Sequence, residues 1–174
     1  GEIETAFENS FPNKRHPLTP PPSFNFGLIE GGVAINVVPD SCRLTLDRRT
    51  IPGESLDEAE QEIAGIIENL KSADPSFEAD YFILYRANAF ETPADHFLVR
   101  QAGRACQCFS VDPAPVGYQQ VSDGRFFADR GVPTILLGPG QAELAHTPDE
   151  HVPVEAVIEA TKIYALAAVE LLND

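Results

Sequence analysis

Apolar and polar positions divide the first half of the chain into helices and strands. Residues 1–10 have a helical composition, and the five prolines between residues 11 and 23 exclude regular structure there. From residue 23 to residue 30, large apolar side chains alternate with smaller or polar ones, which predicts a strand. Gly31 and Gly32 then predict a turn.

A second strand is predicted after this turn, in two pieces. Residues 35–38 are mostly apolar, and apolar residues alternate with polar ones again from residue 42 to residue 47. Pro52-Gly53 is a turn signal that ends this region. The pattern therefore predicts a pair of neighbouring strands before the first long helix.

A helix is predicted over residues 56–71. Ser55 and Glu58 have the spacing of a capping box, in which the hydroxyl accepts a hydrogen bond from an unpaired N–H group of the first turn. Apolar residues recur behind it at helical spacing until Asp74-Pro75 stops the helix. Residues 77–87 are rich in aromatic and β-branched residues and predict a further strand.

The order helix, strand, strand, helix, strand is most of a ferredoxin-like split βαβ sandwich, short of one strand and most of one helix. The absent first strand would lie in the middle of the antiparallel sheet, and its loss would leave unpaired backbone groups on both neighbours. The chain also opens abruptly with Gly-Glu-Ile-Glu-Thr-Ala-Phe-Glu, like the tail of a helix. We therefore expect a piece of a longer protein, or a chain that another chain completes.

The composition changes at residues 91–93, which predicts a boundary between two parts. The second part alternates helical and extended patterns, with helices over residues 95–108, 122–128 and 153–172 and a strand over residues 132–137. The continuous apolar run of that strand is typical of a buried parallel strand. Together these elements predict an α/β layer with too few strands to be complete.

The charge of the chain excludes two classes of partner. It has 27 acidic and 12 basic residues and a net charge of −15, so no basic cluster can neutralise phosphates, and we expect neither nucleic acid nor an anionic membrane as a partner. No apolar run approaches the roughly 18 residues of a membrane span. The three cysteines lack a zinc-ribbon spacing, and we expect buried, reduced thiols in a cytoplasmic protein.

His146 is the sharpest candidate for chemistry. It follows a predicted strand that ends in Gly-Pro-Gly at residues 138–140, where α/β sheets commonly place ligand groups. A neutral imidazole is a good zinc ligand, and the nearby carboxylate of Glu150 could orient it. A loop histidine is also commonly solvated or structural, and the residues alone leave both interpretations open.

A second group of candidates lies near predicted strand and helix ends. Arg49 could hold a substrate carboxylate through two hydrogen bonds, and Asn36 could donate a hydrogen bond to an oxyanion. Ordinary polarity at a strand edge explains the same two residues. Ser122, Asp123 and Gly124 fit either a helix cap or a part of a substrate pocket.

Several familiar catalytic patterns are absent from the sequence. There is no Gly-x-Ser-x-Gly elbow, no phosphate loop and no dinucleotide-binding glycine pattern. His16, His96 and His151 are interpreted as structural or solvated. Two zinc ions need about four to six ligands, and the sequence offers no evident set.

Five stretches together resemble the zinc-dependent amidohydrolase family that includes acetylornithine deacetylase, succinyl-diaminopimelate desuccinylase, aminoacylase and the carboxypeptidase G type enzymes. Their order and spacing fit along the whole chain, which makes them far more specific than any single motif. They are GGVAINVVPD at residues 31–40, DRRTIPGE at 47–54, SDGRF at 122–126, GVPTILLGPG at 131–140 and AHTPDE at 145–150.

The resemblance implies an α/β catalytic domain interrupted by a ferredoxin-like lid through which two subunits dimerise. Residues 1–90 would be that lid without its first strand and most of its first helix. Residues 91–174 would be the closing segment of the catalytic domain. The implied fold class is thus an α+β lid followed by part of a zinc-peptidase α/β domain.

The resemblance also assigns roles to the candidate residues. His146 matches the C-terminal zinc ligand of the family. Asn36 and Arg49 match lid residues that reach the partner subunit's active site, where they bind the substrate's carboxylate or polarise its carbonyl. A loop beside the substrate is matched by Ser122, Asp123 and Gly124.

The remaining catalytic parts of such enzymes precede the lid, so the resemblance places no catalytic residue in this chain. In complete members, a metal-activated water attacks the amide carbon and a Glu acts as the base. We expect two zinc ions in the complete enzyme, with cobalt or manganese as alternatives, and no tight metal binding by this chain alone.

The sequence therefore predicts a portion of a deacylase or peptidase that acts on N-acyl amino acids or small peptides, inactive in isolation. A missing N-terminal segment of roughly 150–200 residues, one domain's worth, would complete it. The alternative is a non-catalytic dimerisation or binding module derived from the same family.

Overall fold

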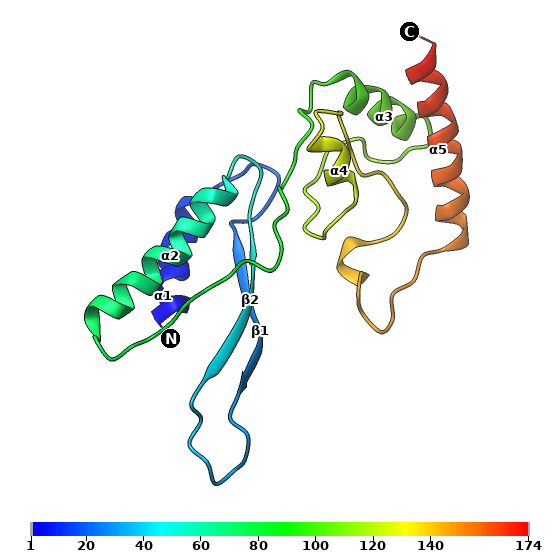
Figure 1. Ribbon diagram of the computed structural model, residues 1–174. Helices are drawn as coiled ribbons and strands as arrows, with labels where there is room; N and C mark the ends of the chain where they lie inside the picture. The colour runs from blue at the N-terminus through cyan, green and yellow to red at the C-terminus, as the bar shows by residue number, and fades with distance from the viewer. Residues whose placement is uncertain (1, 174) are drawn as a thin grey trace. The chain divides into compact units, whose positions relative to one another are not determined.

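The computed structural model describes residues 2–173, and their course is shown in Figure 1. The chain forms two compact units, residues 1–89 and residues 90–174. The first unit consists of two α-helices, a short 3-10 helix and two strands: α1 (Glu2–Ser10), η1 (Phe11–Asn13), β1 (Ser23–Gly31), β2 (Cys42–Arg49) and α2 (Leu56–Ala73).

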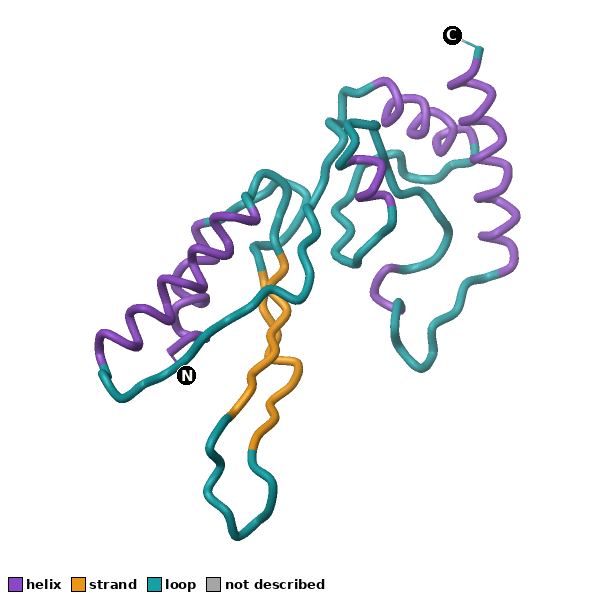
Figure 2. Tube along the Cα trace, viewed as in Figure 1, coloured by secondary structure: helices purple, strands orange, loops and turns teal. Residues whose placement is uncertain are grey.

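Strands β1 and β2 form one antiparallel hairpin, seen as the two orange segments of Figure 2. Their pairing runs from Ser23 opposite Arg49 to Gly31 opposite Cys42. The register shifts between Phe26 and Leu28, so that the chain bulges at this point. The predicted strands over residues 23–30 and 42–47 are therefore confirmed.

Aromatic side chains join helix α1 to the hairpin. Phe7 is fully buried, and its ring lies 5.0 Å from that of Phe11 and 5.1 Å from that of Phe24. Phe26 follows on the same strand, with its ring 5.2 Å from that of Phe24. Rings at these separations bury large apolar areas, so this cluster is the core of the first unit.

Helix α2 begins as its capping residues predict. The Ser55 side chain accepts a hydrogen bond from the backbone N–H of Glu58 at 3.4 Å. Asp57 and Glu58 lie in the first turn and Lys71 in the last, which complements the helix dipole at both ends. The predicted helix over residues 56–71 is confirmed and extends to Ala73.

The prediction of a strand over residues 35–38 is wrong. These residues belong to the loop that reverses the hairpin, where the N–H of Val37 donates to the carbonyl of Ala34 at 3.2 Å. Ile35 is fully exposed and Val38 is 89% exposed. The apolar pattern failed here because the loop projects beyond the helices of its unit, so that these helices do not cover it (Figure 1).

The segment 77–87 is also not a strand. A strand needs backbone hydrogen bonds to a neighbour, and within residues 2–173 none pairs with it. Side chains attach it to α2 instead: Tyr81 donates to Glu60 at 3.4 Å, and Arg86 pairs with Asp57 and Glu60. Leu84 remains 72% exposed.

The second unit is built on two helices that pack against each other. Its elements are α3 (Phe97–Cys108), α4 (Gly124–Ala128), η2 (Ala142–Leu144) and α5 (Val154–Leu172). The shared core of α3 and α5 consists of small and medium side chains: Ala105, Cys106, Ile163 and Ala167. Small residues let the helix backbones approach closely. The three predicted helices of this part are confirmed.

The cysteines are free thiols, as expected, although only Cys106 is buried. Burial raises the pKa of the Cys106 thiol. Cys108 lies two positions later in the same helix and is exposed, as the helical spacing predicts. Cys42 is also exposed, so the expectation of three buried thiols is wrong.

The predicted buried strand over residues 132–137 is wrong. The segment has no strand partner in the part of the chain that the structure describes, and Val132 and Leu136 are 47% and 45% exposed. Side chains form hydrogen bonds with part of its backbone instead. The Thr92 hydroxyl accepts from the N–H of Thr134 at 2.9 Å, and Tyr164 donates to the carbonyl of Leu137 at 2.6 Å.

Helix α5 carries more apolar surface than its unit covers. Val154, Val157 and Ile158 have the helical spacing of a buried face, yet they are 69%, 43% and 51% exposed. No helix among the described residues is long and apolar enough to cross a membrane.

Candidate functional site

The predicted site residues fall in both units. Asn36 and Arg49 belong to the hairpin of the first unit, whereas Ser122, Asp123, Gly124, His146 and Glu150 belong to the second. Different structural features hold the two groups of residues in place. The hairpin places its residues through strand geometry, and the second unit places its residues in loops held by side-chain hydrogen bonds.

Arg49 is the last residue of β2, and its side chain is 47% exposed. Its Nε donates to Asp47 at 2.6 Å, two positions back on the same face of the strand. Its two terminal amino groups have no hydrogen-bonding partner among residues 2–173. An arginine held in this way presents two parallel donors, the geometry that recognises a carboxylate. The exposed Asp–Arg pair also matches the purely structural interpretation of these residues.

Asn36 is exposed in the loop at the other end of the hairpin. The register places this loop beyond the Gly31–Cys42 pair and Arg49 at the opposite end. Seven residue steps of about 3.3 Å separate the two strand ends, roughly 23 Å. Asn36 and Arg49 are therefore not brought together within one copy of this unit, and a ligand the size of an amino acid cannot contact both.

Ser122, rather than Asp123, caps helix α4. The Ser122 hydroxyl accepts from the N–H of Gly124 at 3.1 Å, while the Asp123 side chain makes no capping hydrogen bond and is exposed. Gly124 is closely surrounded, because a Cβ there would lie 3.1 Å from the Thr134 side chain and 3.2 Å from that of Phe90, which would have to move by a few tenths of an ångström. The loop therefore presents the exposed Asp123 carboxylate from a closely packed turn.

His146 is exposed and has a backbone φ of +65°, in the left-handed region that non-glycine residues rarely adopt. The Glu150 carboxylate accepts a hydrogen bond from the backbone N–H of His146 at 2.9 Å. Glu150 thus orients His146 through its backbone amide, whereas the sequence suggested that it would act on the imidazole. Such strained positions cluster at functional sites, which adds an independent reason to single out His146.

Thr147 stabilises the same turn. Its N–H and its hydroxyl both donate to the carbonyl of Leu144, at 3.1 and 2.7 Å. Gln120 ties this loop to the segment before Ser122, because its side-chain amide donates to the carbonyl of Ala142 at 3.1 Å. No sequence pattern marks Gln120 for this role.

The part of the chain that the structure describes shows no cluster of metal ligands. Within the described residues, no three His, Cys, Asp or Glu side chains gather as metal ligands. His146 could supply one imidazole, and a single imidazole holds zinc weakly. Residues 2–173 therefore offer no group of three side chains that would fit a zinc ion.

The other histidines have local structural contacts. The His96 ring accepts from the N–H of Leu98 at 3.2 Å and caps α3, and the His16 ring accepts from the N–H of Leu18 at 3.2 Å. His151 contacts the carbonyl of Asp149 at 2.6 Å. These contacts agree with the structural roles expected for them.

Comparison with known proteins shows to which class the two units belong. The model of the peptidase dimerisation domain of the M20 family matches residues 5–75. Acetylornithine deacetylase of Myxococcus xanthus is 30% identical over 147 residues, which cover 82% of this chain and 36% of that protein. A putative succinyl-diaminopimelate desuccinylase of Mycobacterium tuberculosis is 32% identical over 135 residues, covering 78% of this chain and 35% of that protein.

A solved structure shares the fold of this chain. The crystal structure of aminopeptidase PepT from Bacillus cereus superimposes with a TM-score of 0.67 at 22% identity, covering 97% of this chain and 44% of that one. The fold and the sequence matches define a mixed α and β protein that resembles part of these enzymes. The chain belongs to the M20 family, and it spans only 36% of the Myxococcus relative.

Proposed function

We propose that the chain is the lid and the closing catalytic segment of a metal-dependent amide hydrolase that acts on N-acyl amino acids or small peptides. The observation that carries the proposal is the match to acetylornithine deacetylase across 82% of this chain, through both units. The names of the two relatives share the removal of an acyl group, acetyl or succinyl, from an amino compound.

Arg49 is proposed to bind the carboxylate of the substrate. Its half-exposed side chain is anchored by Asp47 and keeps its terminal amino groups available for a bidentate contact. Asn36 is proposed to act in a different active site, because it lies at the far end of the hairpin. A homodimer formed through the dimerisation domain would let this loop reach the active site of a second copy.

His146 is proposed as one ligand of a zinc centre whose other ligands, and whose general base, come from outside these 174 residues. Zinc supplies Lewis-acid chemistry in such enzymes, and cobalt or manganese can replace it. This chain would hold His146 in place through the hydrogen bond from its backbone N–H to Glu150. It would also present the Ser122–Gly124 turn to the substrate.

The test joins residues 1–174 to the preceding part of the Myxococcus xanthus enzyme and measures metal content and hydrolysis of N-acetylornithine. We expect the chimera to bind zinc and turn over, and we expect residues 1–174 alone to do neither. His146→Ala should lower kcat/KM by about a hundredfold or more. His151→Ala is the matched control and should stay within about twofold.

Three outcomes would count against the assignment. Stoichiometric zinc and turnover by residues 1–174 alone would mean that the chain builds a complete site from other residues. A folded chimera that binds zinc equally well with His146 or Ala at this position would exclude His146 as a ligand. A folded, dimeric chain whose chimera neither binds zinc nor turns over would favour the non-catalytic dimerisation module.

A further inference from the structure

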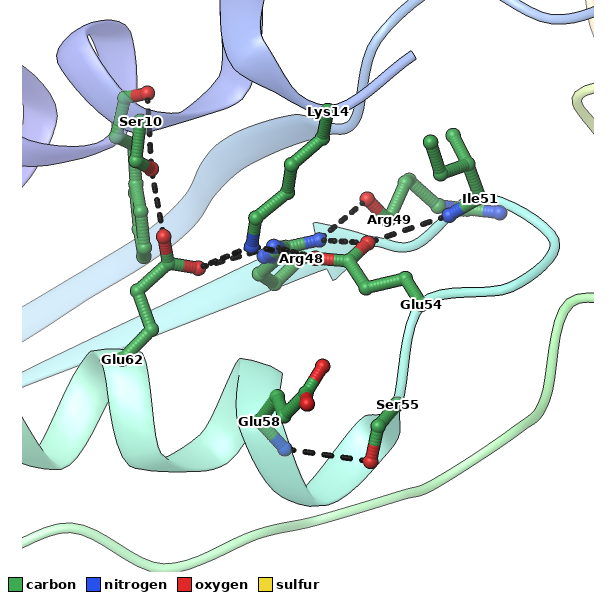
Figure 3. A network of polar contacts seen from close by, with 10 residues as sticks. Ser10, Lys14, Arg48, Arg49, Ile51, Glu54, Ser55, Glu58 and Glu62 are labelled. Atoms are coloured by element: carbon green, nitrogen blue, oxygen red, sulfur yellow. Dashed lines mark hydrogen bonds and ion pairs between the residues drawn. The ribbon is translucent and has the colours of Figure 1, made fainter. Parts of the chain in front are cut away.

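A buried ionic network lies directly behind Arg49, and the site described above does not include it. Its members are Ser10, Lys14, Arg48, Glu54 and Glu62, which we call the Arg48 network (Figure 3). They come from three separate places in the first unit: the end of α1 and the segment after it, the end of β2 with its following turn, and helix α2.

Arg48 is the centre of this network, and its side chain is only 5% exposed. Its guanidinium makes two hydrogen bonds to the Glu54 carboxylate, in which Nη1 donates to Oε2 at 3.0 Å and Nη2 donates to Oε1. Nη2 also donates to Glu62 at 3.0 Å. The guanidinium lies 4.4 Å from the ring centre of Phe11, a cation–π contact that covers its face. A charge buried this far is stable only because it is paired, here through Nη1 and Nη2, while its buried Nε has no hydrogen-bond partner among the described residues.

Lys14 and Ser10 complete the charge balance around the two carboxylates. Lys14 donates to Glu54 at 2.6 Å and to Glu62 at 3.2 Å, and Ser10 donates to Glu62 at 2.6 Å. Burial alone would raise the pKa of both carboxyls, but hydrogen bonds from Arg48, Lys14 and Ser10 outweigh it, and both pKa values are lowered. Two cations thus face two carboxylates that stay ionised.

The network also fixes the backbone on both sides of Thr50. Arg48 Nη1 donates to the carbonyl of Arg49 at 2.9 Å, and Glu54 accepts from the N–H of Ile51 at 3.3 Å. The turn from Ile51 to Glu54 closes with a 3.1 Å backbone hydrogen bond through Pro52 and Gly53, whose φ is +87°. The Arg48 network therefore holds the backbone at the end of β2, where Arg49 lies, from the inner face of that strand.

Arg49 itself points away from this network, because successive residues of a strand face opposite sides. On the outer face its side chain has one described anchor, Asp47. The direction in which the exposed guanidinium projects consequently depends on the backbone that Arg48 holds.

We propose that Arg48 is a positioning residue for Arg49, so that the Arg-Arg pair divides into a buried clamp and an exposed ligand-binding side chain. The proposal rests on the function proposed for Arg49. An arginine is required at the buried position because only its five donors can contact Glu54 twice, Glu62 and a carbonyl together. A lysine has three donors on a single nitrogen and cannot reach all of them.

The test uses the uniformly ¹⁵N-labelled 174-residue chain and follows the Nε–Hε resonance of Arg49 by NMR. Arg48→Lys should move this resonance and weaken binding of N-acetylornithine, titrated through the Thr50 amide, by about fivefold. Lys14→Met is the matched control: it removes two ion pairs of the same network without touching Arg49. It should leave the resonance in place and the affinity within about twofold.

A double-mutant cycle separates positioning from general destabilisation. In the Arg49→Ala background, Arg48→Lys should change the affinity by less than about twofold, because the group it positions is gone. Should Arg48→Lys fail to fold, Glu54→Asp retracts the carboxylate by one methylene and should displace the same resonance.

Equal effects of Arg48→Lys and Lys14→Met on the Arg49 resonance would overturn the proposal and leave a purely structural network. The role of Arg49 itself is judged separately. If Arg49→Ala binds N-acetylornithine as tightly as the unmodified chain, the carboxylate role proposed for Arg49 fails, while the resonance still decides whether Arg48 positions it.

Discussion

At the scale of single residues, the first unit depends on a few buried charges. Glu54 is 6% exposed and accepts hydrogen bonds from Arg48, Lys14 and the backbone of Ile51. Removing its charge leaves Arg48 buried with only Glu62 as an anionic partner. A buried ion that loses a partner is costly, whereas exposed ion pairs contribute little.

Glu54→Gln should therefore lower the free energy of unfolding by about 3 kcal/mol at neutral pH, measured by urea denaturation. Glu68→Gln is the control, because Glu68 is 70% exposed and forms a surface ion pair with Lys71 at 3.1 Å. It should change stability by less than about 0.5 kcal/mol. Equal effects of the two substitutions would mean that the Arg48 network contributes no more than a surface pair.

The same carboxylates predict a dependence of stability on pH. Folding lowers the pKa of Glu54 and Glu62 below their ordinary value of 4.5. Their contribution is thus fully present above that value and is lost as the pH falls through the lower, folded-state values. The urea midpoint should fall as the solution is acidified below about pH 4.5, and Glu54→Gln should make that fall shallower. An unchanged slope in the variant would contradict this assignment.

At the scale of elements, helices were predicted well because each carries its own hydrogen bonds and local signals. Ser55 and the apolar spacing behind it predicted α2, and Pro153 at the start of α5 predicted that helix. The hairpin was also predicted, because its strands are close in sequence and pair with each other. The segments 77–87 and 132–137 were wrongly predicted as strands, since a strand forms only where its backbone pairs with a neighbouring strand.

The contact between α3 and α5 depends on small side chains. Ala167 is 7% exposed and belongs to the core that these helices share, whereas the next residue, Ala168, is exposed. Ala167→Leu should destabilise the chain by about 1–3 kcal/mol through overpacking. Ala168→Leu should have almost no effect on the thermal midpoint. Similar losses from both variants would show that the helices do not pack through Ala167.

At the scale of the whole molecule, backbone hydrogen bonding is unevenly distributed. The β1–β2 ladder is continuous apart from its bulge, while the segments 77–87 and 132–137 have no ladder partner among residues 2–173. Amide hydrogens exchange quickly where the backbone lacks such bonds. We expect exchange in the segment 78–84 to be at least about tenfold faster than in β2, measured by NMR. Equal protection would mean that this segment pairs with another strand.

The site residues illustrate what the sequence can and cannot give. His146, Glu150, Arg49 and Asn36 were found because five separated motifs resemble one family in the same order. Arg48 was missed although the strand alternation puts it on the inner face, opposite Arg49. Its role became visible only when folding brought Lys14, Glu54 and Glu62 around it.

The sequence by itself determined the helices, the hairpin, the family and the list of candidate residues, because propensity, periodicity and motif spacing are properties of neighbouring positions. Only the tertiary structure decided that Asn36 and Arg49 lie at opposite ends of the hairpin, and that Glu150 contacts the backbone of His146 rather than its ring. It also decided which apolar segments lack partners. These outcomes depend on contacts between residues distant along the chain, which no local pattern encodes.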